Sequence, residues 1–158
     1  MVLRLIPFLV LLTVLSVLVG CDSDRLYESY HDFPTPSWHL EDSVTFEISG
    51  VAEDRVLPVI SVRFTDRYDF HNLYLKMVLK DSSDSTIKDT LVNINLFDSK
   101  SGKPLGTGFG NRFTKYDTLT TSGSEIINAK KVQFIQYMRK ESIEGIESLG
   151  LKLIRSGN

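Results

Sequence analysis

Apolar and polar residues alternate along much of the chain from Ser43 to the C-terminus. Alternation with a period of two is the pattern of a half-buried β-strand. No stretch shows the 3.6-residue period of a long amphipathic helix, although Arg139–Glu147 allows a helical turn. The alternating stretches are Val44–Ile48, Leu57–Thr65, Leu73–Lys80, Thr86–Phe97, Lys131–Met138 and Leu149–Ile154, and Phe113–Leu119 is expected to add an irregular strand.

This pattern predicts an all-β fold, an antiparallel β-sandwich of about eight short strands. Each strand is apolar on one side and polar on the other, as expected when one face of each sheet is exposed to water. Polar turns such as Asp81–Ser85 and Asp98–Pro104 separate the strands. A jelly-roll-like strand order is our first expectation and an immunoglobulin-like order the second, because the sequence does not specify which strands pair.

A different pattern occupies the N-terminus. Arg4 precedes an apolar run, Leu5–Val19, that is shorter than the ~20 residues a membrane-spanning helix needs. The run ends at Gly20 and Cys21, and Cys21 is the only cysteine in the chain. We interpret residues 1–20 as a lipoprotein signal peptide that is cleaved before Cys21, whose thiol carries the covalent lipid. The alternatives are a plain secretory signal with an incidental cysteine, or an uncleaved anchor.

The 158-residue chain therefore divides into three expected parts. After the signal peptide, residues 21–42 form a lipidated, aromatic-rich tether whose second half packs along the domain as an irregular edge segment. Residues 43–158 form the β-sandwich domain. The formal net charge of −2 argues against nucleic acid as a partner. A single cysteine cannot form an internal disulfide, so apolar packing must hold the fold together.

Catalytic and metal-binding motifs are not apparent. The three histidines, His31, His39 and His71, are far apart and have no metal-ligand spacing. No serine lies in a nucleophile elbow, and the glycines at 106, 108 and 110 lack the lysine of a phosphate loop, so they indicate a bulge or close backbone approach. Aspartates 66, 69, 81 and 84 could hold calcium only if they converged. We expect no enzyme, no metal and no cofactor beyond the lipid on Cys21.

The segment Arg63–Tyr74 is the best candidate for partner binding, because it mixes arginine, aromatic and asparagine side chains on a connection between two strands. Such side chains combine rigid area with hydrogen bonding. The alternative is a loop whose aromatic residues fold back over the open end of the sandwich. The candidate partner-binding residues are Trp38, Arg67, Tyr68, Phe70, Asn72 and Tyr74.

Over nearly its whole length the chain resembles the gliding motility lipoprotein GldH family of the Bacteroidetes. The residues that carry the resemblance are Cys21-Asp22, Tyr27, Tyr30, Trp38, Arg67–Leu73, Lys88–Leu91, Leu105–Gly108, Gln136–Arg139, Glu144–Ile146 and Leu149–Leu151. Their order and spacing behind the cysteine, rather than any one of them, make the resemblance specific.

The resemblance implies a membrane-anchored, non-catalytic accessory or assembly component of the gliding motility machinery, which is linked to type IX secretion. It implies other gliding or secretion envelope proteins as partners, and a more general envelope role as another option. A carbohydrate-binding module is the alternative, with Trp38, Tyr68 and Tyr74 as a platform for a glycan, and an envelope-polymer hydrolase is the least favoured. We expect the outer membrane, on its periplasmic face, although Asp22 after the cysteine directs retention at the inner membrane in enteric bacteria.

Overall fold

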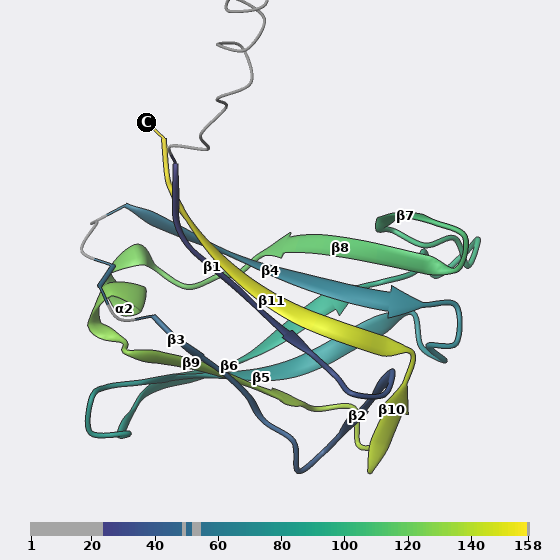
Figure 1. Ribbon diagram of the computed structural model, residues 1–158, viewed down its shortest axis with the longest axis horizontal. Coiled ribbons are helices and arrows are strands. Elements are labelled where there is room, and N and C mark those ends of the chain that lie inside the picture. Colours follow the sequence, from purple (N-terminus) through teal and green to yellow (C-terminus); the bar gives the residue numbers. More distant parts are fainter. Residues whose placement is uncertain (1–23, 49, 52–54, 158) are drawn as a thin grey trace, which may run out of the picture.

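Eleven β-strands and one short helix make up the part of the chain that the computed structural model describes, residues 24–48, 50–51 and 55–157 (Figure 1). Residues 1–20, expected to be a signal peptide, and Cys21 lie outside the described residues. The elements are β1 (Arg25–Asp32), β2 (Ser37–His39), β3 (Val44–Glu47), β4 (Val56–Thr65), β5 (Asn72–Lys80), β6 (Thr86–Asn95), β7 (Thr107–Phe109), β8 (Arg112–Thr118), α2 (Gly123–Asn128), β9 (Lys131–Gln136), β10 (Ser142–Glu144) and β11 (Ile146–Arg155).

The strands form two antiparallel sheets packed face to face, which confirms the predicted all-β sandwich. The five-stranded sheet has the order β1-β11-β4-β8-β7 and the four-stranded sheet the order β3-β9-β5-β6. A small ladder of β2 and β10 continues the sandwich at one end. With the three shortest strands set aside, each strand lies in the sheet opposite to the strand before it, except β6, which forms a hairpin with β5; this is the order of a jelly roll, two interlocked Greek keys.

The predicted number of about eight strands is too low. Eight strands have four or more residues, and the additional three, β2, β7 and β10, have three residues each. A strand of three residues is too short to show a period of two. Glycine and proline around these segments further hide the pattern, since they are typical of turns.

The segment expected as a tether is part of the sandwich. β1 is an edge strand that pairs with β11 through seven residue pairs, among them Tyr27 with Leu153 and Tyr30 with Gly150. Residues 25–32 are therefore an edge strand of the five-stranded sheet, with one register shift between Arg25 and Tyr27. β1 is hard to recognise in the sequence because none of its residues is fully buried, so no clear alternation of apolar and polar residues marks it.

The core lies between the two sheets. The inward residues of β4, namely Ile60, Val62 and Phe64, are fully buried, as are Leu73 and Leu75 of β5. Burying such side chains contributes roughly 1.5–3 kcal/mol each, which is the main force holding the two sheets together. Most of the described apolar residues predicted to point inward do so.

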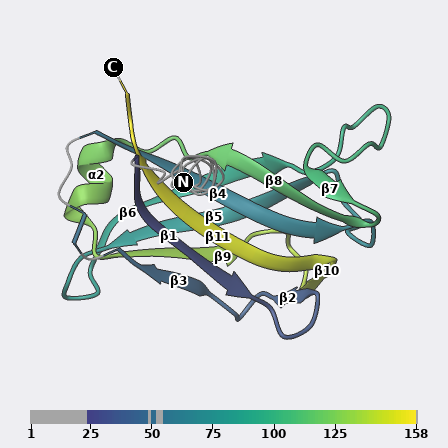
Figure 2. The same ribbon diagram turned by 45° about the horizontal axis from the view of Figure 1, so that its top comes forward.

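The sandwich has two distinct ends (Figures 1 and 2). The start of β1, the end of β11, helix α2 and the 81–85 turn form one end, here called the terminal end. The connections 66–71 and 96–106, the tip of the β7–β8 hairpin and the 137–141 loop form the opposite end, here called the loop end. Register confirms the separation, because Val56 of β4 pairs with Arg155 while Phe64 pairs with Ile146.

Candidate functional site

The structure divides the six predicted partner-binding residues into two groups. Trp38, Tyr68 and Asn72 are buried, with 0%, 4% and 8% of their surface exposed. Arg67 and Tyr74 are exposed and Phe70 is partly buried. Only the second group can touch a partner in this conformation. Partner binding itself stays a prediction, but the buried residues can contribute to it only by holding the surface in place.

Trp38 belongs to the core. Its indole Nε1 donates a hydrogen bond to the carbonyl oxygen of Asp42, and its ring packs against Phe33 with centroids 5.0 Å apart. β2 pairs Trp38 with Ile143 of β10, so the ring lies beneath a short ladder. Trp38 cannot form the glycan platform suggested with Tyr68 and Tyr74, because no face of its ring reaches solvent.

Tyr68 supports the start of β5. Its hydroxyl donates a 2.8 Å hydrogen bond to the carbonyl oxygen of Asn72, and the edge of its ring contacts Phe70. Burial raises the pKa of the Tyr68 hydroxyl, so the group stays a hydrogen-bond donor. The Asn72 side chain in turn donates to Oδ1 of Asn93 at 2.7 Å. The aromatic residues of this loop therefore fold back over the end of the sandwich, as the structural alternative predicted.

An exposed cluster of aromatic and aliphatic side chains lies on the outer face of the four-stranded sheet. Tyr74 of β5, Leu91 of β6 and Tyr137 just after β9 are 43%, 58% and 49% exposed. They surround a shallow depression of about 490 Å³ that Phe70 and Met138 also line. We call these five residues the tyrosine patch. Asn72 and Arg139 complete the lining with polar groups.

Backbone pairing places the tyrosines side by side. The N–H of Tyr137 donates a 2.8 Å hydrogen bond to the carbonyl oxygen of Tyr74. Leu91 of β6 pairs with Lys76 of β5, and Lys76 is two residues from Tyr74 along β5. Because successive side chains of a strand point to opposite faces, Tyr74 and Lys76 share the outer face of the sheet. The patch is thus built on regular strands rather than on a mobile loop.

A buried glutamine holds the loop that completes the patch. Nε2 of Gln136, which is fully buried, donates to the carbonyl oxygen of Lys140 at 2.7 Å, and its Oε1 accepts the Met138 N–H at 2.9 Å. The Met138 sulfur accepts the N–H of Tyr74 at 3.1 Å. These contacts preorganise Met138 beside the tyrosines, so little ordering would be needed on binding.

The patch has a charged border. Lys76 Nζ lies 2.8 Å from Asp89 Oδ2. This hydrogen-bonded ion pair raises the pKa of Lys76 and lowers that of Asp89. Both groups are solvent-exposed, so the pair adds little stability but keeps both groups charged beside Leu91 and Tyr137, which line the same shallow hollow. An apolar centre with a polar rim is the anatomy of a protein-binding surface.

Sequence reasoning missed Leu91, Tyr137 and Met138 as site residues. The sequence contains an indication for Leu91. It is an apolar residue at an outward-facing position of β6, and the neighbouring outward-facing positions are the polar residues Asp89 and Asn93. Tyr137 and Met138 follow the last regular pair of β9, so alternation alone does not show their direction.

The outer face of the five-stranded sheet carries another exposed pair, Tyr30 and Tyr116. The Tyr30 ring lies over Gly150, where an added Cβ would come within 2.6 Å of its Cδ1 atom. Its hydroxyl donates to Oε1 of Glu28 at 2.6 Å, which raises the pKa of Tyr30. Among the described residues, the hydroxyls of Tyr74 and Tyr137 have no such hydrogen-bond partner. The tyrosine patch is therefore the better candidate for binding.

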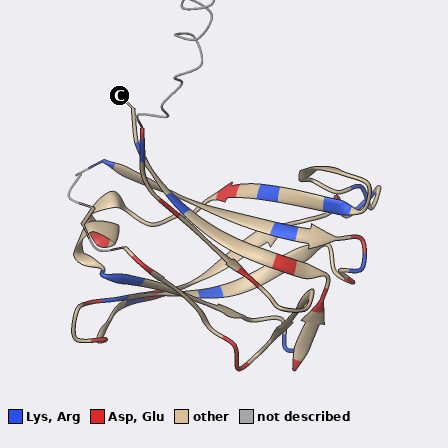
Figure 3. Cartoon of the chain, viewed as in Figure 1, with Lys and Arg blue, Asp and Glu red and all other residues tan. Residues whose placement is uncertain are grey.

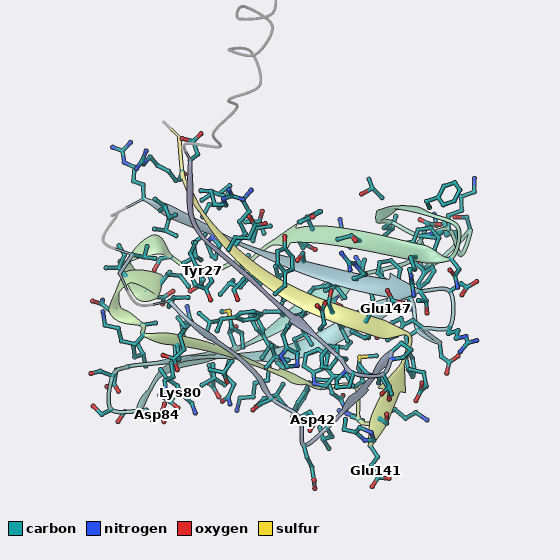
Figure 4. All side chains as sticks on the ribbon, viewed as in Figure 1. Tyr27, Asp42, Lys80, Asp84, Glu141 and Glu147 are labelled. Atoms are coloured by element: carbon teal, nitrogen blue, oxygen red, sulfur yellow. The ribbon has the colours of Figure 1, made fainter. Side chains whose placement is uncertain are left out.

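The possible calcium site does not form. Asp66 and Asp69 lie at the loop end, whereas Asp81 and Asp84 lie at the terminal end, with the nine residues of β5 between them. Figure 4 shows Asp84 beside Lys80 at the end opposite Glu147. In the described part of the chain, no group of three or more His, Cys, Asp or Glu residues could hold a metal ion. Within the same residues, no helix has the length and apolar character needed to span a membrane.

The close approach expected of the glycines occurs at Gly106 and Gly108. A Cβ added to Gly106 would lie 2.7 Å from the carbonyl oxygen of Thr114, and one at Gly108 would collide with that of Arg112. These glycines therefore let β7 and the residues before it run directly against β8.

The fold and surface define a jelly-roll β-sandwich domain with a preorganised aromatic surface. A family model described as GldH lipoprotein matches residues 25–153, so the chain belongs to the GldH lipoprotein family. It is accordingly a lipid-anchored protein of the cell envelope.

Two relatives match over most of their length. The chain is 26% identical to "Gliding motility lipoprotein GldH" of Flavobacterium johnsoniae over 155 residues, covering 91% of this chain and 93% of that protein. It is 28% identical to "Gliding motility lipoprotein GldH homolog" of Christiangramia forsetii over 150 residues, covering 88% and 89%. Among solved structures, the VP2 subviral particle of infectious bursal disease virus overlaps 87% of this chain and 34% of that one at 15% identity. The TM-score of 0.39 is too low to support any argument.

Proposed function

We propose that this protein is a non-catalytic accessory or assembly component of the gliding motility machinery linked to type IX secretion. Its lipid is carried by Cys21 and holds it at the outer membrane, on the periplasmic face. The tyrosine patch docks a partner protein of the envelope. Family membership supports the gliding role, and the exposed, preorganised tyrosine patch is the observation that supports docking.

The short distance from Cys21 to the sandwich supports this arrangement. Arg25, the first residue of β1, follows Cys21 by four residues. An extended chain of that length reaches at most about 14 Å. The terminal end of the sandwich is therefore held close to the bilayer, and the loop end is presented about 30 Å further out, the length of a ten-residue strand such as β11. Tyr74 and Tyr137 lie toward that outer end.

The composition of the tyrosine patch favours a protein partner. Tyrosine offers a large, rigid contact area at a low cost in conformational entropy, and it is enriched in interfaces. Leu91 and Met138 add aliphatic and sulfur contacts beside the two rings, which suits the side chains of a protein. Two neighbouring exposed tyrosines also fit a sugar ring, and this feature favours the carbohydrate-binding alternative.

The test uses a gliding bacterium that lacks its own family member and expresses this protein. The double variant Tyr74→Ala/Tyr137→Ala is expected to be lipidated and folded but to lose gliding on agar. The matched control is Tyr116→Ala, which removes an equally exposed tyrosine from the other sheet and should glide normally. Normal gliding of the double variant would refute docking through the patch.

Two further measurements separate the parts of the proposal. Incorporation of radiolabelled palmitate should occur in the wild-type protein and be absent in Cys21→Ser, and equal labelling of the two would refute the anchor. Titration of the protein with cello- and chito-oligosaccharides tests the glycan alternative. Saturable binding that Tyr74→Ala/Tyr137→Ala abolishes would favour the carbohydrate-binding function over protein docking.

A further inference from the structure

The β7–β8 hairpin ends in an exposed phenylalanine. Phe109 is 97% exposed, whereas the other exposed large apolar residues described are 41–58% exposed. Phe109 pairs with Arg112 across a two-residue turn whose first residue, Gly110, has a φ of +66°. A positive φ at this position favours glycine in a tight hairpin. The turn therefore fixes Phe109 at an apex where it has almost no contact with the rest of the molecule.

The segment that carries Phe109 is basic, although the chain as a whole is acidic. Residues 99–116 contain four cations, Lys100, Lys103, Arg112 and Lys115, and no Asp or Glu, in a chain of formal net charge −2. Figure 3 shows the basic positions along β8 at the hairpin side, with the acidic position only at its far end.

These cations are largely uncompensated. Arg112 pairs with Glu147 at 2.8 Å. Across the described residues, none of the three lysines of this segment forms a side-chain ion pair. The positive charge of residues 99–116, which lead into and form most of the hairpin, is thus available to an outside partner. Leu105, 45% exposed in the same segment, adds a second apolar contact.

We infer that the β7–β8 hairpin is a second docking element, in which Phe109 enters an apolar pocket of a protein partner whose rim is acidic. A large aromatic side chain surrounded by charged residues is typical of a binding hot spot, and opposite charges on the partner raise the association rate. The hairpin tip belongs to the loop end. It therefore points away from the bilayer if Cys21 holds the terminal end there, as proposed above, so the partner approaches from the side opposite the anchor.

The test places a photo-crosslinking benzoylphenylalanine at position 109 of the full-length, lipidated protein in its own cell envelope. Position 87 is the matched control, because Ile87 is also an exposed apolar residue but belongs to the start of β6, toward the terminal end. Illumination is expected to give one discrete protein adduct from position 109 that position 87 does not give. The captured protein is identified by mass spectrometry and purified.

Binding of that purified protein then tests the chemistry. Phe109→Ala should weaken the affinity by about tenfold or more, and Lys100→Glu/Lys103→Glu/Lys115→Glu should do the same at low salt and less at high salt. Ile87→Ala and Lys130→Glu, which change an exposed apolar residue and an exposed lysine elsewhere on the molecule, should bind like the wild-type protein. The variants of the exposed residues Phe109, Ile87 and Lys130 should unfold at the wild-type temperature, and the triple lysine variant close to it, because Lys115 is only partly buried.

Several results would overturn the inference. One is the absence of a specific adduct at position 109. Another is a captured protein that binds Phe109→Ala and the triple lysine variant as tightly as it binds the wild-type protein. A third is binding to phosphatidylglycerol vesicles that Phe109→Ala abolishes, which would indicate docking to a membrane. Loss of gliding in Tyr74→Ala/Tyr137→Ala together with no adduct at position 109 would reject the hairpin while leaving the proposed function intact.

Discussion

Replacing Trp38 with alanine separates a structural role of this residue from a binding role. The side chain is fully buried, stacks on Phe33 and donates a hydrogen bond to the carbonyl oxygen of Asp42. Truncating a buried tryptophan costs about 3–5 kcal/mol through lost burial and the cavity that remains. The freed Asp42 carbonyl costs more if water cannot reach it. A domain of this size has a stability of about 5–15 kcal/mol, so Trp38→Ala should remove much of it.

The measurement is urea unfolding of the unlipidated polypeptide from residue 22 onward. Far-UV circular dichroism is the signal, because Trp38 is the only tryptophan and its loss abolishes tryptophan fluorescence. With a slope of about 1–3 kcal/mol per molar urea, a loss of this size lowers the midpoint by roughly 1 M or more. In the wild-type protein, the fluorescence of the buried indole should shift to the red at the same midpoint as the dichroism changes, as expected for two-state unfolding.

Two control variants show whether the loss of stability is specific to the buried indole. Trp38→Phe keeps an aromatic ring against Phe33 but loses the indole donor, so it should cost clearly less than Trp38→Ala. Tyr74→Ala removes a half-exposed side chain and should change stability by about 0.5 kcal/mol or less. An unfolding midpoint of Trp38→Ala equal to that of the wild-type protein would refute the core assignment. If Trp38→Ala weakened partner binding without changing stability, Trp38 would be a residue that contacts the partner.

Three smaller predictions follow from the same geometry. Tyr68→Phe should lower stability by about 1–3 kcal/mol in chemical denaturation, because it leaves the carbonyl oxygen of Asn72 without its buried donor. Gly145→Ala should be strongly destabilising in thermal melts, since Gly145 has a φ of +83° and an added Cβ would lie 2.5 Å from the backbone nitrogen of Tyr68; a normal melting temperature would contradict this packing. A hydrogen bond from Lys88 is the main cause that lowers the pKa of Glu125 to about 2 from 4.5, so this carboxylate stabilises the fold fully above pH 4.5 and loses that contribution as the pH falls toward 2. The stability advantage of the wild-type protein over Glu125→Gln should therefore shrink across this range, and an advantage that is constant with pH would contradict the pairing.

Much of the fold could be predicted because β-strand alternation is a local property. β4, β5 and β11 each bury the alternating apolar side chains that their sequences indicate, and they also bury a few residues on the other face. The capping box of α2, in which Ser122 and Glu125 exchange hydrogen bonds, is also a local pattern of two residues three positions apart, although no helix was predicted there. β1 was missed because an edge strand is only partly covered.

The candidate site could be predicted only in part. The segment around Phe70 and Tyr74 was identified from its residue types, and both residues line the tyrosine patch. Leu91, Tyr137 and Met138 join them from other strands, through pairing that no local pattern specifies. Trp38 and Tyr68 have the same aromatic chemistry as Tyr74 but are buried, since residue type does not reveal which side of a sheet a neighbour will cover.

The amino-acid sequence by itself determined the inward and outward faces of the long strands and a family resemblance that the family match confirmed, and it predicts a signal peptide that ends before Cys21. Only the tertiary structure decided that β1 pairs with β11, that the aspartates of the two turns lie at opposite ends, and which aromatic residues remain exposed. The physical reason is distance along the chain. Alternation arises from the pleat of a single strand, whereas pairing and burial depend on contacts between residues as far apart as Tyr30 and Gly150, and these are fixed only when the whole core packs.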